Sequence, residues 1–511
     1  MCSRGRSFFS PAAGLKGSRS LRTVSLAVSA AFLILSLSCS AGPGGGPADA
    51  ETGTSYDTTA REYVIPEALE GLKYGGEKFT VLCRSGGMVG DDDLFCDELV
   101  NRPVEEAVYH RTQTVNRTLG VEIVPVRMEE GDMLAEIELV IASGSSAYDL
   151  VECCEWKAVP MIARGYMYDL ISESGPYFDA ESPWWSQLWI REATMGNGSL
   201  YFITGAPALS LYRLIFVMFY NKDLGKDLKV EDLYSVVEEG RWTLDCLSGL
   251  VAPLFRDMNG NDRRDTDDSF GLVMNDETAT DPFWSSCDIT LFSRGEDGWY
   301  EYSDSDTAKV SSVFDRLYDL VHSNRGTWSP SYGDQYAKTE EMFASGNALL
   351  ANTHLRYAEF EKFRNMQDEY GIIPLPKYDE GQKDYYSFVH DQYSVFFIPV
   401  TARDRAMSGA VLEDLGYESC STVLPVYYDL VLKGRYASDP QTRRMLDLIT
   451  ENVRMDPGWI YGNVLGEPCQ QLIRFPVHNG VRSFASDLVK VSRDLPDYLE
   501  DFSRAIEALE H

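Results

Sequence analysis

The hydrophobic pattern of residues 78–153 alternates between strands and helices. Apolar runs of strand length lie at 78–83, 121–127 and 148–153. Between these runs, residues 104–119 and 132–143 repeat apolar positions with the period of a helix. Strands and helices in this order are typical of a doubly wound, mostly parallel sheet, so the pattern predicts an α/β fold.

The carboxyl ends of these strands are where we expect a ligand, because ligands of doubly wound sheets bind outside that edge. The first strand ends at residues 84–87 and the third at 154–157. Arg84, Glu155 and Trp156 are therefore candidate binding residues. A surface ion pair is the alternative interpretation for Arg84 and Glu155.

A second apolar stretch, residues 211–220, lacks the alternation of a half-exposed strand and predicts a buried central strand. Asn221 follows as a candidate N-cap of a short helix, and Thr243 as the N-cap of a later one. Gly205 and Pro207 interrupt the apolar pattern just before the strand. We expect the chain to pass from one sheet to another at this interruption.

The first 38 residues have the layout of an export signal. Five basic residues and no acidic ones precede the apolar run 24–37, which is short for a membrane span. Cys39 and the Gly- and Pro-rich residues 42–47 resemble the start of a mature bacterial lipoprotein, although Ser36 departs from the usual motif. We expect residues 1–38 to be a signal peptide, Cys39 to be lipidated and residues 39–76 to be a flexible tether. An ordinary cleaved signal is the alternative.

The chain is strongly acidic, with a formal net charge of −33 that becomes −38 when the five basic residues of the signal are removed. Nucleic acid and anionic membrane surfaces are therefore not expected partners. Eight cysteines remain beyond Cys2 and Cys39, and none of them has the spacing of a zinc site. The simplest interpretation is that these cysteines are buried thiols.

Residues 257–268 have the spacing of a twelve-residue calcium loop. Oxygen ligands are predicted at positions 1, 3, 5, 9 and 12, with a main-chain carbonyl at position 7; in order of position they are Asp257, Asn259, Asn261, Arg263, Asp265 and Asp268. Position 6 is Asp262 rather than Gly, but Asp tolerates the left-handed conformation better than most residues. We expect a structural Ca²⁺ here, with an acidic solvated turn as the alternative.

Three segments carry a resemblance to a known family when they are taken together and in order. They read Phe-Tyr-Asn-Lys-Asp-Leu at 219–224, Trp-Thr-Leu-Asp at 242–245 and Met-Phe-Ala-Ser-Gly-Asn-Ala at 342–348. These segments resemble the extracellular solute-binding proteins of ABC importers, the group that includes maltodextrin and alginate-oligosaccharide binders. Residues 371–377 (Gly-Ile-Ile-Pro-Leu-Pro-Lys) resemble a lipoprotein subgroup of that family.

The resemblance implies a two-lobed periplasmic-binding-protein-like fold, in which each lobe is a doubly wound sheet and the lobes close on a solute. By analogy the chain would cross between the lobes near 205–211, 350–354 and 396–402. Residues 77–207 with 352–397 would form the N-terminal lobe, and residues 208–351 with 398–511 the C-terminal lobe. The implied partners are a small-molecule solute, an ABC permease and, through the lipid anchor, the membrane. We expect the protein to be a monomer.

Aromatic side chains are the second class of candidate binding residues, because sugar rings stack on Trp and Tyr while acids, amides and Arg bind their hydroxyls. The chain has 9 Trp and 29 Tyr, most of which are expected in the core. The candidates expected near the cleft are Trp156, Trp184, Trp185, Tyr212, Trp284, His354, Arg356, Asp391, Tyr393 and Trp459. Core packing is the alternative for each Trp, and a surface ion pair for Arg356.

An enzyme is not expected, because no nucleophile elbow, phosphate-binding loop, dinucleotide fingerprint or His-Glu-x-x-His motif occurs. Glu152 and Glu155 are only three residues apart, which is poor evidence for a glycosidase pair on opposite faces of a bond. We therefore expect no catalytic residues and no catalytic cofactor.

The function expected from the sequence is that of a lipid-anchored receptor on the outer face of a bacterial membrane. It would bind a solute, most simply a carbohydrate, and deliver it to a permease. Three alternatives remain: a binding protein for a peptide or another polar solute, a surface sensor or adhesion lipoprotein, and a secreted glycoside hydrolase.

Overall fold

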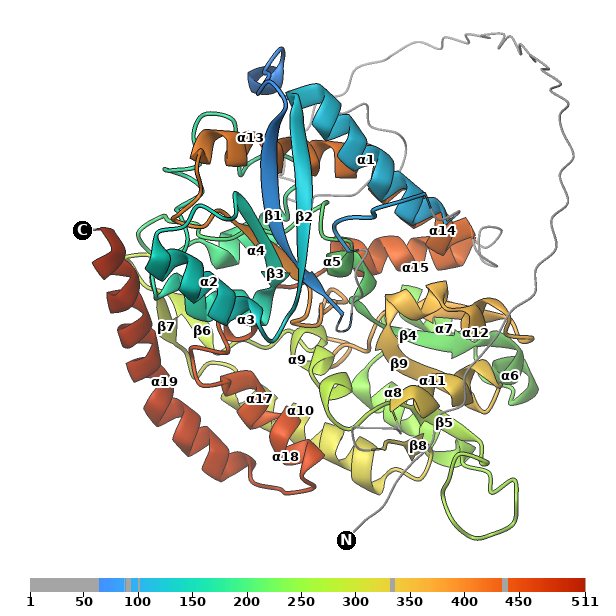
Figure 1. Ribbon diagram of the computed structural model, residues 1–511. Coiled ribbons are helices and arrows are strands. Elements are labelled where there is room, and N and C mark those ends of the chain that lie inside the picture. Colours follow the sequence, from blue (N-terminus) through green and yellow to red (C-terminus); the bar gives the residue numbers. More distant parts are fainter. Residues whose placement is uncertain are drawn as a thin grey trace, which may run out of the picture. The chain divides into compact units, whose positions relative to one another are not determined.

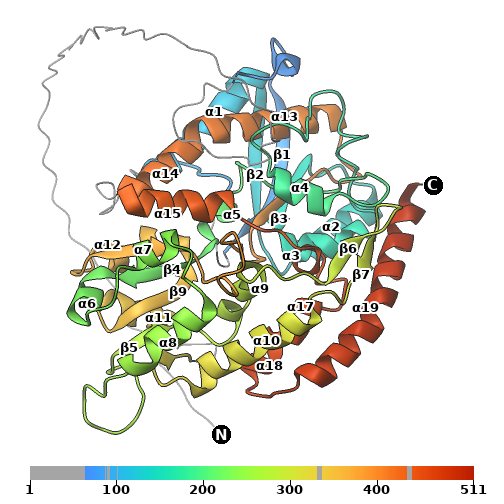
Figure 2. The ribbon, with the colours of Figure 1, turned by 180° about the vertical axis from the view of Figure 1, so that it is seen from behind.

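A computed structural model describes residues 64–86, 88, 93–99, 102–330, 336–433 and 440–510 (Figure 1). The expected signal peptide, Cys39 and most of the expected tether lie outside these residues. The described part of the chain contains a four-stranded sheet, a five-stranded sheet and a two-stranded hairpin. Its helices cover both larger sheets, as Figures 1 and 2 show from opposite sides.

The first sheet has the strand order β11-β3-β1-β2. Its strands are β1 (Glu77–Ser85), β2 (Val121–Glu129), β3 (Leu150–Cys154) and β11 (Ser394–Phe397). Strand β1 pairs in parallel with both β2 and β3, and β11 joins β3 antiparallel. The predicted strands and the predicted mostly parallel arrangement are confirmed for this sheet.

The helices that connect these strands begin and end where the sequence indicates. They are α1 (Pro103–Leu119), α2 (Met133–Ser143) and α3 (Glu155–Ile162). Pro103 lies in the first turn of α1, where its missing N–H is not needed. Gly120 and Gly144 end α1 and α2 in the left-handed conformation, with a φ of 64° each.

The second sheet has the order β10-β4-β9-β5-β8 and is mixed. Its strands are β4 (Phe216–Asn221), β5 (Phe270–Val273), β8 (Thr327–Trp328), β9 (Ala348–His354) and β10 (Tyr370–Ile373). Strand β4 is antiparallel to both β9 and β10, whereas β5 is parallel to β8 and β9. Every residue of β4 is buried, which confirms the predicted central strand.

The first half of the predicted strand 211–220 is instead a short helix, α5 (Leu209–Arg213). The backbone N–H of Ser210, in its first turn, donates to Asp93 Oδ1 at 2.6 Å. A carboxylate far away in sequence therefore satisfies a group that a helix start leaves without a partner. The hydrophobic pattern cannot reveal this contact.

The remaining helices follow or separate these strands. Before β11 they are α4 (Gln187–Ala193), α6 (Lys222–Asp227), α7 (Leu233–Glu238), α8 (Leu244–Val251), α9 (Pro282–Ser286), α10 (Thr307–Tyr318), α11 (Tyr336–Ala344) and α12 (Glu361–Arg364). After β11 they are α13 (Arg405–Glu418), α14 (Leu424–Lys433), α15 (Pro440–Glu451), α16 (Pro457–Ile460), α17 (Pro468–Leu472), α18 (Arg474–His478) and α19 (Phe484–Glu507). The hairpin consists of β6 (Phe292–Arg294) and β7 (Tyr300–Tyr302). Single turns of 3₁₀ or π helix lie at Glu67–Leu69, Ala252–Leu254, Thr278–Thr280, Asp319–Ser323, Leu355–Glu359, Ser419–Val423 and Ala508–Glu510.

Both predicted N-caps are confirmed. The side chain of Asn221 accepts a hydrogen bond from Leu224 N at 2.8 Å, and that of Thr243 accepts one from Cys246 N at 3.2 Å. The expected strand-to-helix turn after β4 therefore forms through the side chain that the sequence indicated.

The division of the chain between the two sheets differs from the expected lobe boundaries in two places. Strand β10 pairs with β4, so the return to the first sheet lies between residues 373 and 394 rather than near 350–354. Helices α13 and α14 pack on α1, so residues 405–433 accompany the first sheet rather than the second (Figure 1). Both differences have the same cause. The hydrophobic period of a segment predicts whether it is a strand or a helix, but it does not predict which strand or helix that segment packs against.

No helix in the described ranges combines the length and the apolar character needed to cross a membrane.

Candidate functional site

A buried network of charged and hydroxyl side chains ties the first sheet to the segment that leaves it. We call Arg84, Asp93, Glu152, Ser210 and Ser394 the crossing network. Arg84 Nε donates to Glu152 Oε1 at 3.2 Å, and Arg84 Nη2 donates to Ser394 Oγ at 2.8 Å. Ser210 Oγ donates to Asp93 Oδ2 at 2.6 Å and accepts from Ser394 N at 2.8 Å. These contacts join β1, β3, β11 and α5.

The crossing network has two carboxylates for one guanidinium. Ser394 Oγ contacts both Asp93 and Glu152, but its hydroxyl carries only one hydrogen. A proton on one of the carboxyls satisfies the second contact. Burial is the main cause that raises the pKa of Glu152 from 4.5 to about 7, Asp93 adds to it, and Arg84 opposes it. Glu152 is therefore the group that holds this proton below neutral pH.

The carboxyl ends of both sheets define where a ligand site is expected. In the first sheet β1 lies between β2 and β3, so the order of the strands across the sheet reverses between β1 and β3. In doubly wound sheets a ligand is expected beyond the carboxyl ends of the strands at such a point. Glu155 is the first residue after β3. In the second sheet β9 ends at His354 and is followed by Arg356. The segment 387–393, which returns to the first sheet, pairs with Ile215 and reaches both edges.

Five residues from these edges come together in what we call the junction cluster: Glu155, Asp391, Tyr393, Trp459 and Arg474. Glu155 N donates to Tyr393 O at 3.0 Å. Arg474 Nη2 lies 3.8 Å from Asp391 Oδ2, and its guanidinium carbon lies 5.5 Å from the centre of the Trp459 ring. Four of the five were predicted from the sequence, and they lie in α3, the returning segment and α16.

Carboxylates outnumber cations around the junction cluster. Arg474 donates from Nε to both oxygens of Asp281, at 2.8 and 3.0 Å, so one guanidinium serves Asp281 and Asp391 together. Burial opposes ionisation of Asp391, but His390 and Arg474 outweigh it and hold the pKa of Asp391 below its usual range. Burial, with a further contribution from Asp391, raises the pKa of Glu155 well above its usual range.

Several buried polar atoms in and beside the junction cluster have no hydrogen-bond partner within the described part of the chain. They are Glu155 Oε1, His354 Nε2, His390 Nε2, Trp459 Nε1 and both side-chain polar atoms of Gln470. An unpaired buried polar group costs about 1–3 kcal/mol. Such groups grouped at the edges of two sheets are suited to a ligand that supplies their hydrogen bonds.

Aromatic rings form a row beside these atoms. Phe216 lies 4.3 Å from His354 and 6.0 Å from Phe388, between ring centres, and Phe388 lies 4.9 Å from Trp459. His354 and His390 meet edge to face at 5.3 Å. The row therefore runs from the end of β9 to the junction cluster.

The structure places the other predicted binding residues apart from the junction cluster or at its margin. Arg84 belongs to the crossing network and is buried. Trp185 donates to Glu413 at 3.1 Å, Trp284 to Asp456 at 3.4 Å, and Trp184 packs edge to face on Tyr417. Tyr212 is likewise buried, with its ring 6.0 Å from that of Tyr428. Trp156 and Arg356 are partly exposed. The core-packing alternative thus describes Trp184, Trp185 and Trp284.

Sequence reasoning missed Asp281, His390, Gln470 and Arg474. Asp281 and Arg474 pair although 193 positions separate them, so no spacing rule could have found them. His390 directly precedes the predicted Asp391, and their side chains approach to 3.0 Å. That adjacency was the only sequence signal for His390.

Comparison with solved structures shows what arrangement the two sheets form. An ABC substrate-binding protein from Listeria monocytogenes, in complex with cycloalternan, matches 83% of this chain and 99% of its own, with a TM-score of 0.52 and 14% identity. An ABC transporter solute-binding protein from Thermotoga lettingae, bound with α-D-tagatose, matches 83% of this chain and 100% of its own, with a TM-score of 0.51 and 12% identity. The chain has the fold of ABC substrate-binding proteins. The predicted two-lobed α/β class is therefore confirmed.

Sequence comparisons add nothing to this result, because no protein-family model and no curated protein matches the chain. The fold assignment therefore rests on the similarity to solved structures alone.

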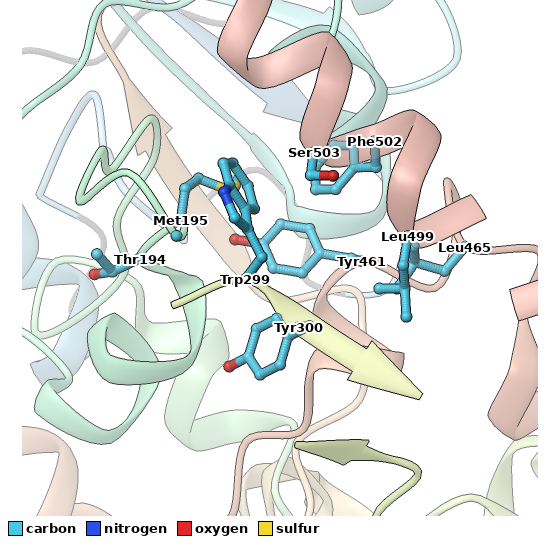
Figure 3. A pocket seen from close by; sticks show the side chains of 10 residues that line it. Thr194, Met195, Trp299, Tyr300, Tyr461, Leu465, Leu499, Phe502 and Ser503 are labelled. Carbon is cyan, nitrogen blue, oxygen red and sulfur yellow. The ribbon is translucent and has the colours of Figure 1, made fainter. Parts of the chain in front are cut away.

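A separate, small cavity of about 20 Å³ lies beneath α19 (Figure 3). Trp299, Tyr300, Tyr461 and Phe502 line it with aromatic rings. The hydroxyl of Tyr461 donates to Ala193 O at 2.6 Å, and that of Tyr300 contacts Glu192 at 2.5 Å. Because the tyrosine hydroxyls already have protein partners, this cavity offers few groups for a polar solute, and we do not assign the substrate site to it.

The predicted calcium loop folds around the side chain of Asp265. Asn261 Nδ2 donates to Asp265 Oδ2 at 2.7 Å, and Asn259 Nδ2 donates to Asp265 Oδ1 at 3.4 Å. Asp257 accepts from three backbone N–H groups, of residues 260, 261 and 262. Asp262 has a φ of 57°, so it adopts the expected left-handed conformation without being Gly.

The loop is also closed at its far end, because Asp268 is buried and accepts from Met258 N and Asp265 N at 3.0 Å each. In the described ranges no three His, Cys, Asp or Glu side chains are close enough to hold a metal ion. An ion here would therefore need the amide oxygens of Asn259 and Asn261, turned toward it, and the carbonyl of Arg263.

The protonated carboxyl of the crossing network predicts a pH-dependent effect of Glu152→Gln. Because the folded pKa of about 7 exceeds the usual 4.5, Glu152 adds stability below about pH 4.5 and that stability is lost as the pH rises to 7. The loss amounts to roughly 3 kcal/mol at 1.36 kcal/mol per pKa unit. Urea unfolding at pH 5 and pH 8 should show that Glu152→Gln gains stability relative to the wild type as the pH rises.

The matched control is Glu138→Gln, whose carboxylate pairs with Arg164 on the surface and should give the same difference at both pH values. A free-energy difference between Glu152→Gln and the wild type that is constant from pH 5 to pH 8 would contradict the shared proton.

Proposed function

We propose that this protein is an extracellular receptor that binds a carbohydrate between its two lobes and delivers it to an ABC permease. The observation that carries the proposal is the junction cluster. It combines carboxylates, an arginine and an indole beside the carboxyl end of β3, with buried polar atoms left for a ligand to bind.

The substrate-binding fold also supports the proposal that the ligand is a carbohydrate. The Listeria monocytogenes protein of this fold is in complex with cycloalternan, and the Thermotoga lettingae protein is bound with α-D-tagatose. Both ligands are sugars, which present hydroxyls around a ring with apolar faces. Indole and carboxylate groups together suit such a ligand, because one stacks on the ring and the other accepts from hydroxyls.

The proposed mechanism is closure of the lobes around the solute. Hinge motion between domains is the usual response of this architecture to a ligand. A solute that contacts Glu155 from the first lobe and Trp459 or Arg474 from the second binds the closed form better than the open form. The ligand thus shifts the population toward closure, and no chemical step is involved.

A peptide or another polar solute is the second candidate within the same fold. Glycoside hydrolysis is the candidate from another class. Glu152, one member of the imagined acid pair, is held by Arg84 and Ser394 in the crossing network rather than facing the junction. That placement favours a binding protein over an enzyme.

The binding proposal predicts that oligosaccharides titrate the protein and that Trp459→Phe weakens the interaction. Phenylalanine keeps an aromatic ring but removes the indole Nε1, which has no partner in the described residues. The loss of one hydrogen bond should raise the Kd about fivefold to tenfold. Isothermal titration of a panel of glucans and other oligosaccharides measures this directly.

The matched control for that titration is Trp299→Phe, an indole that lines the cavity under α19 instead. Its Kd should match that of the wild type. Heat of binding from peptides, with none from any sugar, would replace the carbohydrate proposal by the peptide alternative, and release of hydrolysed glycoside would support the enzyme.

We also propose that residues 1–38 are removed and that Cys39 is lipidated, which holds the receptor at the outer face of a bacterial membrane. The support is the basic, then apolar, then small-residue layout before Cys39. One acyl chain alone binds a membrane only marginally, so stable anchoring would need a multiply acylated cysteine.

Lipidation predicts that cells expressing the wild type retain the protein in the membrane fraction and that Cys39→Ser releases it to the medium or periplasm. Cys246→Ser, at a half-buried cysteine of α8, should stay in the membrane fraction. Immunoblots of the separated fractions distinguish these outcomes. Equal retention of Cys39→Ser and the wild type would mean that Cys39 is not the anchor.

Finally, we propose that residues 257–268 bind a structural Ca²⁺. The support is the spacing of the oxygen-bearing side chains over residues 257–268, together with the left-handed turn at Asp262. The ion would hold the loop between α8 and β5 in place. Weak calcium sites of extracellular modules have a Kd of about 10⁻⁴–10⁻³ M, which outside a cell is sufficient.

The calcium proposal predicts that 10 mM CaCl₂ raises the Tm by about 2 °C or more over the value in chelator, because a ligand that binds only the folded state stabilises it. Asp265→Asn should abolish the shift. Asp267→Asn, at a position of the same loop that supplies no predicted ligand, should keep it. Differential scanning calorimetry provides the measurement. A wild-type Tm that is the same with calcium and with chelator would favour a solvated acidic turn.

A further inference from the structure

Glu155 is a buried carboxyl group with no cation as an ion-pair partner in the described part of the chain. Its side chain is 1% exposed, and its Oε1 has no hydrogen-bond partner among the described residues. The charged neighbour that acts on it is Asp391, another acid. Arg474, the cation of the junction cluster, is bound by Asp281 and shared with Asp391.

This arrangement contrasts with the crossing network, in which each carboxylate contacts Arg84 and a serine hydroxyl. A buried acid without a counter-ion is costly unless it is neutral, and burial indeed raises the pKa of Glu155. Burial therefore favours the protonated form of this acid while the junction is empty. Its Oε1 can accept a hydrogen bond from a ligand, and a positive charge beside it would favour the ionised form.

A neutral sugar hydroxyl would satisfy one oxygen of Glu155 but would supply no positive charge to favour its ionised form. A protonated amine supplies both the hydrogen bond and the missing charge, and charge-assisted hydrogen bonds are about twice as strong as neutral ones.

We propose that the solute of this receptor is an amino sugar, or an oligosaccharide that contains one, and that Glu155 is the residue that selects its ammonium group over a neutral hydroxyl. This inference deepens the proposed function and depends on it. It names the class of carbohydrate rather than a new site.

Binding would then be linked to one proton. The ammonium group enters with its charge unchanged, and the carboxyl group of Glu155 ionises and gives its proton to the buffer. No bond of the solute is made or broken. Because burial favours the protonated carboxyl of the empty junction and an ammonium group favours the ionised one, binding of the amine releases up to one proton for each solute bound.

The test is a titration at pH 6 with three oligosaccharides of equal length: one of glucosamine, one of N-acetylglucosamine and one of glucose. The glucosamine form should bind at least tenfold more tightly than either neutral form. Its binding enthalpy should depend on the ionisation enthalpy of the buffer with a slope of about one proton, whereas the neutral forms should show none.

Glu155→Gln removes the group that ionises, so the ratio of neutral to amine Kd should fall to near one and the buffer dependence should vanish. Glu413→Gln is the matched control, because Glu413 is also a buried acid with a pKa of about 7 but contacts Ser182 and Trp185 rather than the junction. It should retain both the preference and the proton release.

The buffer dependence of the wild type tests the proposal even where a variant fails to fold. Equal affinity for the amine and neutral forms, with a buffer-independent enthalpy, overturns the role of Glu155 and leaves the carbohydrate receptor standing. Failure of all three oligosaccharides to bind overturns the proposed function and this inference together.

Discussion

One guanidinium shared by two buried carboxylates holds the described fold together where the chain passes between its sheets. Arg84 contacts Glu152 and Asp93, and the hydroxyls of Ser394 and Ser210 complete the set. A buried polar network stabilises a single arrangement only when every member has a partner. Here that condition needs one proton, so the segments that leave and re-enter the first sheet are fixed by a balance between charge and burial.

The junction cluster differs from the crossing network in how its polar groups are satisfied. It too is buried and acidic, but Glu155, Trp459 and Gln470 keep polar atoms without a partner in the described residues. The two networks are neighbours along the chain, since Glu155 follows Glu152 of β3 by three residues and Asp391 precedes Ser394 of β11 by three residues. The crossing network, whose polar groups have partners, thus supports the junction cluster, in which some polar atoms have none. A rigid support beneath a set of free hydrogen-bonding groups is what a binding site requires.

Local features of the chain were predictable where the cause is itself local. The helix α1 begins at Pro103 and ends before Gly120, and Asn221 and Thr243 cap the helices that follow them, because each effect acts within a few residues. The left-handed turn at Asp262 is similar, since it was expected from its position in the short segment 257–268. In contrast α5 was expected to be a strand, because its first turn is stabilised by Asp93, 117 positions away. Strand β10 was assigned to the wrong side for a related reason, since only its pairing with β4 places it.

By itself, the sequence determined the order of strands and helices, their caps, and the α/β class, because hydrophobic period and backbone hydrogen bonding are set by near neighbours. It also marked Glu155, Asp391, Tyr393 and Trp459 as candidates by their position after strands or beside aromatic residues. Only the tertiary structure decided that Asp391 and Trp459 lie beside Arg474 and that Glu155 meets Tyr393. It also decided that Arg84, Trp185 and Trp284 pair with acidic side chains inside the fold. The physical reason is that the cost of a buried charge depends on what packs against it, and those partners come from anywhere in the chain.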